Sequence, residues 1–225
     1  MPDDVELALA FGEIHATPPA GPWLSERELA VLATLVRAPR RDTWLAGRWL
    51  GKGLVEEHLG TGVDGGVALA CIEILAADDG APEVWLDGRR HAWSLSLSHR
   101  AGRVAAAFAS RPVGVDLEHI EPRSAAFVRD YLTDGEQSWV MALGDDGVSL
   151  GANLIWSAKE AALKALRCGL RRDTRSVEVT VGDDRLVVYD SATGATLEGF
   201  WHIRDEHIVT VVTASLYKPE GIETG

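Results

Sequence analysis

Cysteine is scarce in this sequence. Cys71 and Cys168 are the two thiols among 225 residues. They stand far apart and show none of the short spacings by which zinc and redox sites are recognised. We therefore expect both to be small, buried side chains of a protein that works in a reducing compartment.

Positive charge and long apolar runs are lacking as well. The formal net charge is −12, which disfavours a nucleic-acid partner but allows a local basic pocket. Asp3, Asp4 and Glu6 occupy the place where a signal peptide carries basic residues. No apolar run approaches the ~20 residues of a membrane span. We therefore expect a cytoplasmic protein without membrane contact.

The composition that remains is that of an ordered globular protein, with 46% hydrophobic and 25% charged residues. A capping box at Ser25 and Glu28 predicts a helix that runs to Arg37. Apolar spacing predicts a second from Asp42 to Leu59, and a composition rich in Ala, Leu, Lys and Glu predicts a third from Asn153 to Arg167. Pro39 is expected to separate the first two, and residues 145–147 are expected to form a loop. Residues 127–143 are predicted to be helical with a break at 133–135.

Strands are predicted in both halves of the chain. Residues 83–86, 93–98 and 113–118 alternate as strands do, and four more at 177–181, 186–189, 197–203 and 208–214 predict an antiparallel meander. Residues 103–109 fit a strand or a helix start, and residues 67–75 fit a strand or a short helix. Each half of the chain contains helices followed by strands. This order suggests that the chain is a loose internal duplication with its boundary near residue 110, although no sequence motif can be aligned between the halves.

Two acidic side chains share one face of the predicted strand 113–118. Side chains two apart on a strand point the same way, so Asp116 and Glu118 lie together. Glu160 and Lys164, four apart on a predicted helix, also share a face. If the helix packs across the strand, three carboxylates meet one ammonium, and a hard cation such as Mg²⁺ would relieve their repulsion. Taken singly, solvated carboxylates and a surface ion pair are the more common explanation of these residues.

Candidate phosphate-binding residues lie upstream of these acids. Ser98, His99 and Arg100 follow a predicted strand and could donate to phosphate oxygens, although a histidine there is also compatible with an ordinary surface or core position. A second set is basic and comprises Arg40, Arg41, Arg48, Lys52, Arg89 and Arg90. A solvated basic face is the common explanation, but in so acidic a chain it also suggests a polyphosphate ligand.

The order of these motifs resembles a known signature. Gly-Val-Asp-Leu-Glu at 114–118 and Trp-Ser-Ala-Lys-Glu-Ala-Ala-Leu-Lys at 156–164 resemble the motifs of 4′-phosphopantetheinyl transferases, and residues 41–52 and 96–99 match as well. The resemblance covers residues 40–170. The chain length is similar to that of the larger, surfactin-synthetase-activating (Sfp-type) class rather than the half-length trimeric class.

The resemblance implies a reaction and a set of roles. The family transfers 4′-phosphopantetheine from coenzyme A to a serine of an acyl or peptidyl carrier protein and releases adenosine 3′,5′-bisphosphate. Mg²⁺, or Mn²⁺ as an alternative, would be held by Asp116, Glu118 and Glu160. Lys164, His99 and Ser98 would contact the phosphates of coenzyme A. The adenosine end would meet Arg41, Arg48, Lys52, Arg89 and Arg90. The base would be Glu160, directly or through a water, with a water held by Glu136 as the competing candidate.

The implied fold is α+β, a pseudo-twofold pair of similar halves at 1–110 and 111–225, each a small antiparallel sheet packed on a long helix. Coenzyme A would lie in the cleft between the halves, and a monomer would suffice. Candidates for docking the carrier lie between the two metal motifs and comprise Arg123, Phe127, Arg129, Tyr131, Leu132, Trp139 and Met141.

Two departures from the family pattern stand out. Arg100 replaces the Ser or Thr that follows the histidine in many members, and Arg89-Arg90-His91 lacks the expected proline. The rival functions are a non-catalytic protein that binds coenzyme A or a nucleotide, and a Mg²⁺-dependent phosphohydrolase.

Overall fold

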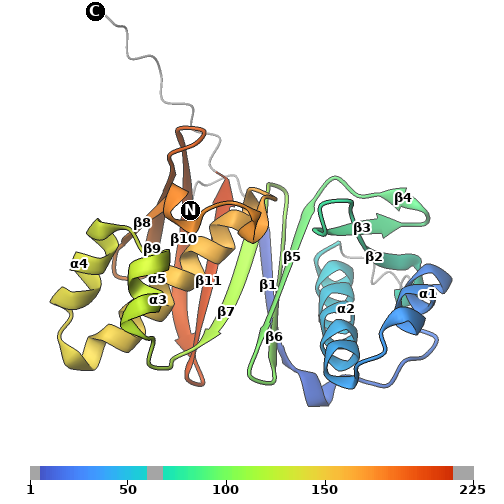
Figure 1. The fold of residues 1–225 in the computed structure, drawn as a ribbon. Helices are drawn as coiled ribbons and strands as arrows, with labels where there is room; N and C mark the ends of the chain where they lie inside the picture. Colours follow the sequence, from blue (N-terminus) through green and yellow to red (C-terminus); the bar gives the residue numbers. More distant parts are fainter. Residues whose placement is uncertain (1–5, 60–67, 215–225) are drawn as a thin grey trace, which may run out of the picture.

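The structure is a computed structural model that describes residues 6–59 and 68–214. It consists of two halves that lie side by side, with β1, β5, β6 and β7 in the middle (Figure 1). The first half contains β1 (Leu7–Glu13), α1 (Glu26–Thr34), α2 (Ala38–His58), β2 (Ile72–Ala76), β3 (Pro82–Leu86), β4 (Arg89–Arg90), β5 (Ser94–Arg100) and β6 (Arg103–Ala109). The second contains β7 (Val113–His119), α3 (Ala125–Tyr131), α4 (Asp134–Ala142), α5 (Asp145–Ala165), β8 (Val177–Val181), β9 (Arg185–Asp190), β10 (Ala195–Arg204) and β11 (His207–Ala214).

Both halves follow one topological plan. The first strand of each half pairs antiparallel with the last, β1 with β6 and β7 with β11. The last strand then pairs with the one before it, β5 or β10. The second half continues into a five-stranded sheet, β7-β11-β10-β9-β8, whereas the first half divides into β1-β6-β5 and β2-β3-β4. The predicted α+β class is confirmed, and the division into units 1–110 and 111–225 stays a prediction.

A buried ion pair anchors the long helix of the first half. Ser25 caps α1, and the Glu28 side chain closes the capping box. Glu28 Oε2 also accepts from Lys52 Nζ of α2 at 2.5 Å, and its Oε1 accepts from the backbone N–H of Ile74 in β2 at 3.0 Å. Lys52 and Glu28 are both 0% exposed. One carboxylate therefore joins two helices and a strand.

The second half repeats this arrangement. Thr133 caps α4, and Glu136 closes the capping box. Glu136 pairs with Lys159 of α5 at 2.9 Å and accepts from the backbone N–H of Val179 in β8 at 2.8 Å. The repeated element is thus Ser or Thr, a Glu three residues later, and a Lys on the next long helix. This is the shared motif that was not recognised in the sequence, because its residues are ordinary and their spacing differs between the halves.

Two helices begin earlier than predicted. The helix expected from Asp42 begins at Ala38, because Pro39 occupies its first turn, where proline is tolerated. Residues 145–147, predicted as a loop, form the first turn of α5. Asp145 and Asp146 stabilise that turn by placing negative charge at the positive end of the helix dipole. No helix within the described ranges combines the length and the apolar character needed to cross a membrane.

Serine side chains of β5 join the two halves. The hydroxyl of Ser96 accepts from the backbone N–H of Val115 at 3.0 Å, and that of Ser98 accepts from the backbone N–H of Leu117 at 3.2 Å. β7 is an edge strand of its sheet, so these bonds satisfy donors that would otherwise be buried without partners. The interface between the halves therefore fixes β5 beside β7.

Helix α5 crosses β7 at a glycine. A Cβ added to Gly114 would lie 1.8 Å from the backbone oxygen of Ala161 in α5. No side chain fits there, so Gly114 brings the helix backbone onto the strand. This contact brings β7, which carries Asp116, close to α5, which carries Glu160.

We expect Gly114→Ala to lower the free energy of unfolding by about 1–3 kcal/mol or more, because the helix must move off the strand. Gly53→Ala is the matched control, since a Cβ at Gly53 in α2 meets nothing within 4 Å. That change should be neutral or stabilise the protein by about 0.5–1 kcal/mol. Urea unfolding of both variants measures the difference, and equal stability of the two would contradict the close contact.

Candidate active site

The predicted acidic side chains meet where β7 passes under α5. Asp116 and Glu118 of β7 are 2% and 8% exposed, and Glu160 of α5 lies beside them. Glu121, in the loop after β7, adds a fourth carboxylate through the arginines it shares with Glu118. We call Asp116, Glu118, Glu121 and Glu160 the carboxylate cluster.

Asp116 is the centre of a hydrogen-bond network. Its Oδ1 accepts from Lys164 Nζ at 2.7 Å and from Ser98 Oγ at 2.8 Å. Its Oδ2 accepts from Ser157 Oγ at 2.9 Å, and Ser157 lies 2.8 Å from the Thr210 hydroxyl. Strand, helix and neighbouring half therefore all contribute to one buried carboxylate, which fixes its orientation.

Glu118 is bound by different partners. Trp156 Nε1 donates to its Oε1 at 3.0 Å. Arg123 and Arg100 both approach its Oε2, at 2.9 Å and 3.3 Å. The sequence analysis missed Trp156 and Arg123 as partners of this carboxylate, since no local pattern relates them to Glu118.

Glu160 carries the least compensated charge of the cluster. Within residues 6–59 and 68–214 its recorded polar contact is an ion pair with Lys164 at 4.0 Å. Burial, followed by the negative charge of Asp116, raises the pKa of Glu160 to about 7. Burial and Asp116 also raise the pKa of Glu118. A proton or a cation is therefore bound favourably beside Glu160.

The raised pKa of Glu160 predicts a pH dependence of stability. Between its ordinary value of 4.5 and about 7, the folded protein holds the Glu160 proton more tightly than the unfolded chain does. The free energy of unfolding should therefore fall as the pH rises through this window. Glu160→Gln, which mimics the neutral acid, should remove this contribution. Urea unfolding of both proteins between pH 4.5 and 8 without added metal measures it, and identical slopes would contradict the shifted pKa.

The donors of the cluster fit a hard divalent cation only in part. Asp116 and Glu160 supply carboxylate oxygens next to an excess of negative charge, which suits Mg²⁺. Glu118 is tied to two guanidinium groups, so its role as a third ligand stays a prediction and its contacts count against it. Accordingly, no three His, Cys, Asp or Glu side chains in the described part of the chain are arranged to hold a metal ion.

Two hollows flank β5 beside the cluster. One of about 410 Å³ lies between the halves and is lined by Ser96, Leu97, Lys164 and Arg90, among others. The other, of about 550 Å³, is lined by Arg40, Trp44, Arg48, Leu97, Ser98 and His99. Partial burial and the nearby Lys164 ammonium lower the pKa of His99. The predicted phosphate contacts are thus divided between the two hollows, with Lys164 and Arg90 in one and Arg48, Ser98 and His99 in the other.

The other basic residues that were predicted to bind the adenosine end occupy three different environments. Arg48 stacks on Trp44 with 4.4 Å between guanidinium carbon and ring centre and donates to the Ile74 carbonyl. Arg41 and Arg89 are exposed. Lys52, predicted to contact the adenosine end, does not reach the hollow, because its ammonium is enclosed by Glu28 and the carbonyls of Trp23 and Leu69.

Glu136 also lies elsewhere than predicted. It was expected to hold a water beside the metal. Its Oε2 pairs with Lys159 and caps α4, and its Oε1 binds the backbone of β8. At 2% exposure it is part of the core, so a structural role replaces the expected catalytic one. Ser96, in contrast, was not predicted to have a role, although it binds the backbone of β7. The alternation of Ser94, Ser96 and Ser98 on one face of β5 was a signal for it in the sequence.

A known family model matches the region that carries the cluster. Residues 112–212, just under half of the chain, match the sequence model of the 4′-phosphopantetheinyl transferase superfamily. No curated protein matches the chain.

Among solved structures, a holo-[acyl-carrier-protein] synthase of Thermotoga maritima is 23% identical with a TM-score of 0.39. That match covers 56% of this chain and 74% of the other. An ACPS–CoA complex of Chronobacterium ammoniagenes is 21% identical with a TM-score of 0.39, and the match covers 48% of this chain and 96% of the other.

Proposed function

We propose that the protein transfers 4′-phosphopantetheine from coenzyme A to a serine of an acyl or peptidyl carrier protein, with Mg²⁺ as cofactor. The observation that carries the proposal is the assembly of Asp116, Glu160 and Lys164 inside the region that matches the superfamily. Their positions next to two hollows with basic linings support an anionic, phosphate-bearing substrate.

The reaction requires that negative charge be neutralised on both sides of the phosphorus–oxygen bond that breaks. The serine oxygen forms a bond to the β-phosphorus, and the bond from that phosphorus to the bridging oxygen breaks. Adenosine 3′,5′-bisphosphate leaves with the bridging oxygen. Bound between Asp116 and Glu160, Mg²⁺ would neutralise phosphate oxygens. Lys164 would add a positive charge from the α5 side, and His99 would reach from the opposite hollow.

Glu160 is the better candidate for the base that accepts the serine proton. In the metal-free protein its pKa of about 7 suits a base near neutral pH, and while it holds Mg²⁺ it would accept the proton through a water. Its side chain is 21% exposed, so an incoming hydroxyl or a water can reach it. Glu136 has neither property, since it is buried and paired with Lys159.

The chain is proposed to belong to the larger, Sfp-type class and to act as a monomer. The duplicated Glu–Lys anchor supports two equivalent halves within one chain. β5 of the first half and β7 with α5 of the second all contribute to the site, so one chain supplies both sides. Cys71 and Cys168 are both free thiols, with Cys71 exposed and Cys168 partly buried rather than both buried as expected, and free thiols support a reducing, cytoplasmic location.

Some of the residues expected to dock a carrier protein are exposed. Tyr131 of α3 and Met141 of α4 are 40% and 58% exposed, and the Arg129 side chain of α3 is 66% exposed. Leu132 is 0% exposed and belongs to the core, while Arg123 is committed to Glu118. An apolar patch with one cation suits an acidic partner.

Intact mass of an apo carrier protein tests the proposal. Incubation with the enzyme, coenzyme A and Mg²⁺ should add one phosphopantetheine group, and EDTA should abolish the addition. Coenzyme A turnover without a carrier would indicate a phosphohydrolase instead. Binding of coenzyme A without turnover on fatty-acid, polyketide or peptidyl carriers would indicate a binding protein.

A further inference from the structure

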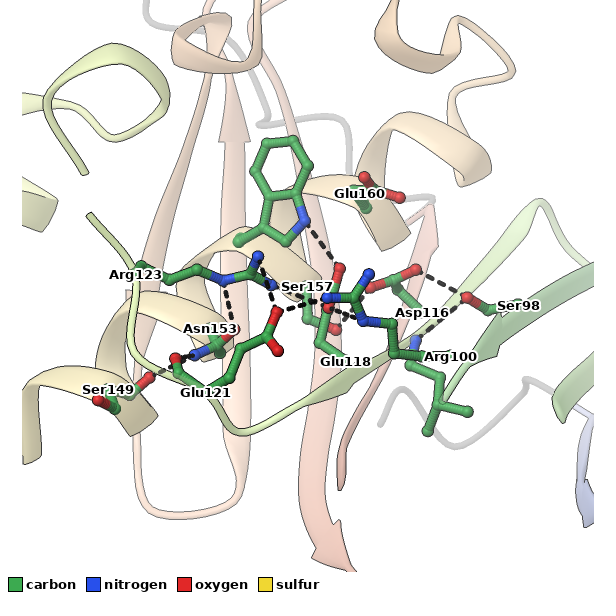
Figure 2. Close-up of polar contacts among 12 residues, drawn as sticks. Ser98, Arg100, Asp116, Glu118, Glu121, Arg123, Ser149, Asn153, Ser157 and Glu160 are labelled. Atoms are coloured by element: carbon green, nitrogen blue, oxygen red, sulfur yellow. Dashed lines mark hydrogen bonds and ion pairs between the residues drawn. The ribbon is translucent and has the colours of Figure 1, made fainter. Parts of the chain in front are cut away.

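Arg100 reaches into the carboxylate cluster from the neighbouring half. It lies at the end of β5, where its Nε is 3.3 Å from Glu118 Oε2 and its Nη2 is 2.5 Å from Glu121 Oε1. Figure 2 shows its guanidinium pointing toward these two carboxylates, with Asp116 close by. Its side chain is 39% exposed, so it enters the cluster from the solvent side.

Arg123 holds the same oxygen of Glu118 from the other side and is firmly placed. Its Nη2 donates to Glu118 at 2.9 Å and its Nε donates to Asn153 Oδ1 at 2.6 Å. Asn153 is 0% exposed and donates in turn to the carbonyls of Glu121 and Ser149. Arg123 is thus fixed by buried groups, whereas Arg100 is held by the two carboxylates alone among the ion pairs found in the described residues.

These contacts separate the two ends of the cluster. Oε2 of Glu118 faces two guanidinium groups, which stay charged at any pH the protein experiences. A divalent cation bound to Glu118 Oε2 would have to displace one guanidinium group, or it would be repelled by both positive charges. Asp116 faces one ammonium, and Glu160 stands 4.0 Å from that same ammonium. A cation therefore meets least resistance between Asp116 and Glu160.

We propose that Arg100 is a positioning residue of the metal site, which keeps Glu118 as an ion-pair partner so that Asp116 and Glu160 alone bind the divalent cation. The inference rests on the proposed function, because it assumes that a cation binds at the cluster. It makes the free protein a weak metal binder, since a cation with two protein carboxylates takes its other ligands from water and phosphate.

Binding of Mn²⁺ alone to the purified protein tests this, with free Mn²⁺ measured by electron paramagnetic resonance. Glu160→Gln should weaken binding at least about tenfold, whereas Glu118→Gln should change it less than about threefold. Arg100→Ser leaves Glu118 with Arg123 and Trp156 but removes one of the two cations on its Oε2, and it should tighten binding about tenfold. The double variant Arg100→Ser with Glu118→Gln should lose that gain.

Two further variants control for charge and folding. Arg103→Ser removes an arginine of similar exposure that pairs with Glu13 and Asp205, and it should leave Mn²⁺ affinity unchanged. Arg100→Lys keeps a cation beside Glu118 and should bind like the parent protein. Circular dichroism confirms that each variant is folded before titration.

The outcomes separate this inference from the proposed function. If Glu118→Gln weakens Mn²⁺ binding as much as Glu160→Gln does, Glu118 is a ligand and the role given to Arg100 is wrong. If Arg100→Ser and Arg103→Ser tighten binding equally, the effect is one of general charge, which also overturns it. If the parent protein and Arg100→Ser both fail to bind Mn²⁺, the metal site itself fails, and this inference fails with it. The carrier-mass experiment still judges transfer independently.

Discussion

Replacing Asp116 with alanine is expected to slow phosphopantetheine transfer by about 10²–10³-fold or more. The Asp116 carboxylate orients Lys164 through a 2.7 Å hydrogen bond and aligns Ser98 and Ser157. Without it, the ammonium loses its fixed position beside the substrate phosphates, and the proposed metal site loses a ligand. Single-turnover transfer to an apo carrier, followed by intact mass, measures the loss.

Loss of folding must be separated from loss of chemistry in that experiment. Asp184→Ala is the matched control, because it removes one carboxylate from an exposed position before β9, where it pairs with Arg185. It should transfer at the rate of the parent protein. Lys164→Ala should reproduce the Asp116→Ala defect, since each residue acts through the other. Near-normal turnover in either variant, with a normal circular dichroism spectrum, would show that the active site lies elsewhere.

Replacing Glu136 with alanine is expected to lower the free energy of unfolding by about 3–5 kcal/mol. The ammonium of Lys159, which is 0% exposed, would keep only the carbonyls of Thr174 and Val177. The backbone N–H groups of Thr133 and Val179 would lose their acceptor as well. Urea unfolding at a temperature well below the midpoint measures the change.

The equivalent change in the first half provides the comparison. Glu28→Ala removes the carboxylate from Lys52 in the same way and should cost a similar amount. Transfer per folded molecule should stay close to that of the parent protein in Glu136→Ala. A variant that is fully stable but slow would restore Glu136 as the residue that holds a catalytic water.

Local patterns were sufficient for much of the site. The alternation at 113–118 placed Asp116 and Glu118 on one face, and the spacing of Glu160 and Lys164 placed both on one side of α5. The capping box at Ser25 and Glu28 and the four-strand meander were also visible in the sequence. These features depend on neighbours within a few residues, so the period of the element fixes them.

The tertiary structure alone decided which charges meet. Lys52 and Glu136 look like any polar residue of an amphipathic helix, yet each belongs to a buried pair whose partner lies 24 or 23 positions away. Likewise, Arg100 and Arg123 reach Glu118 from different elements, and no periodicity relates them to it. The sequence by itself determined the elements and the faces on which the acidic residues lie. The tertiary structure decided which side chains meet at the site, through the packing of α5 on β7 at Gly114 and of β5 beside β7. The reason is that an ion pair depends on the distance between two groups in space and not on their separation in the sequence.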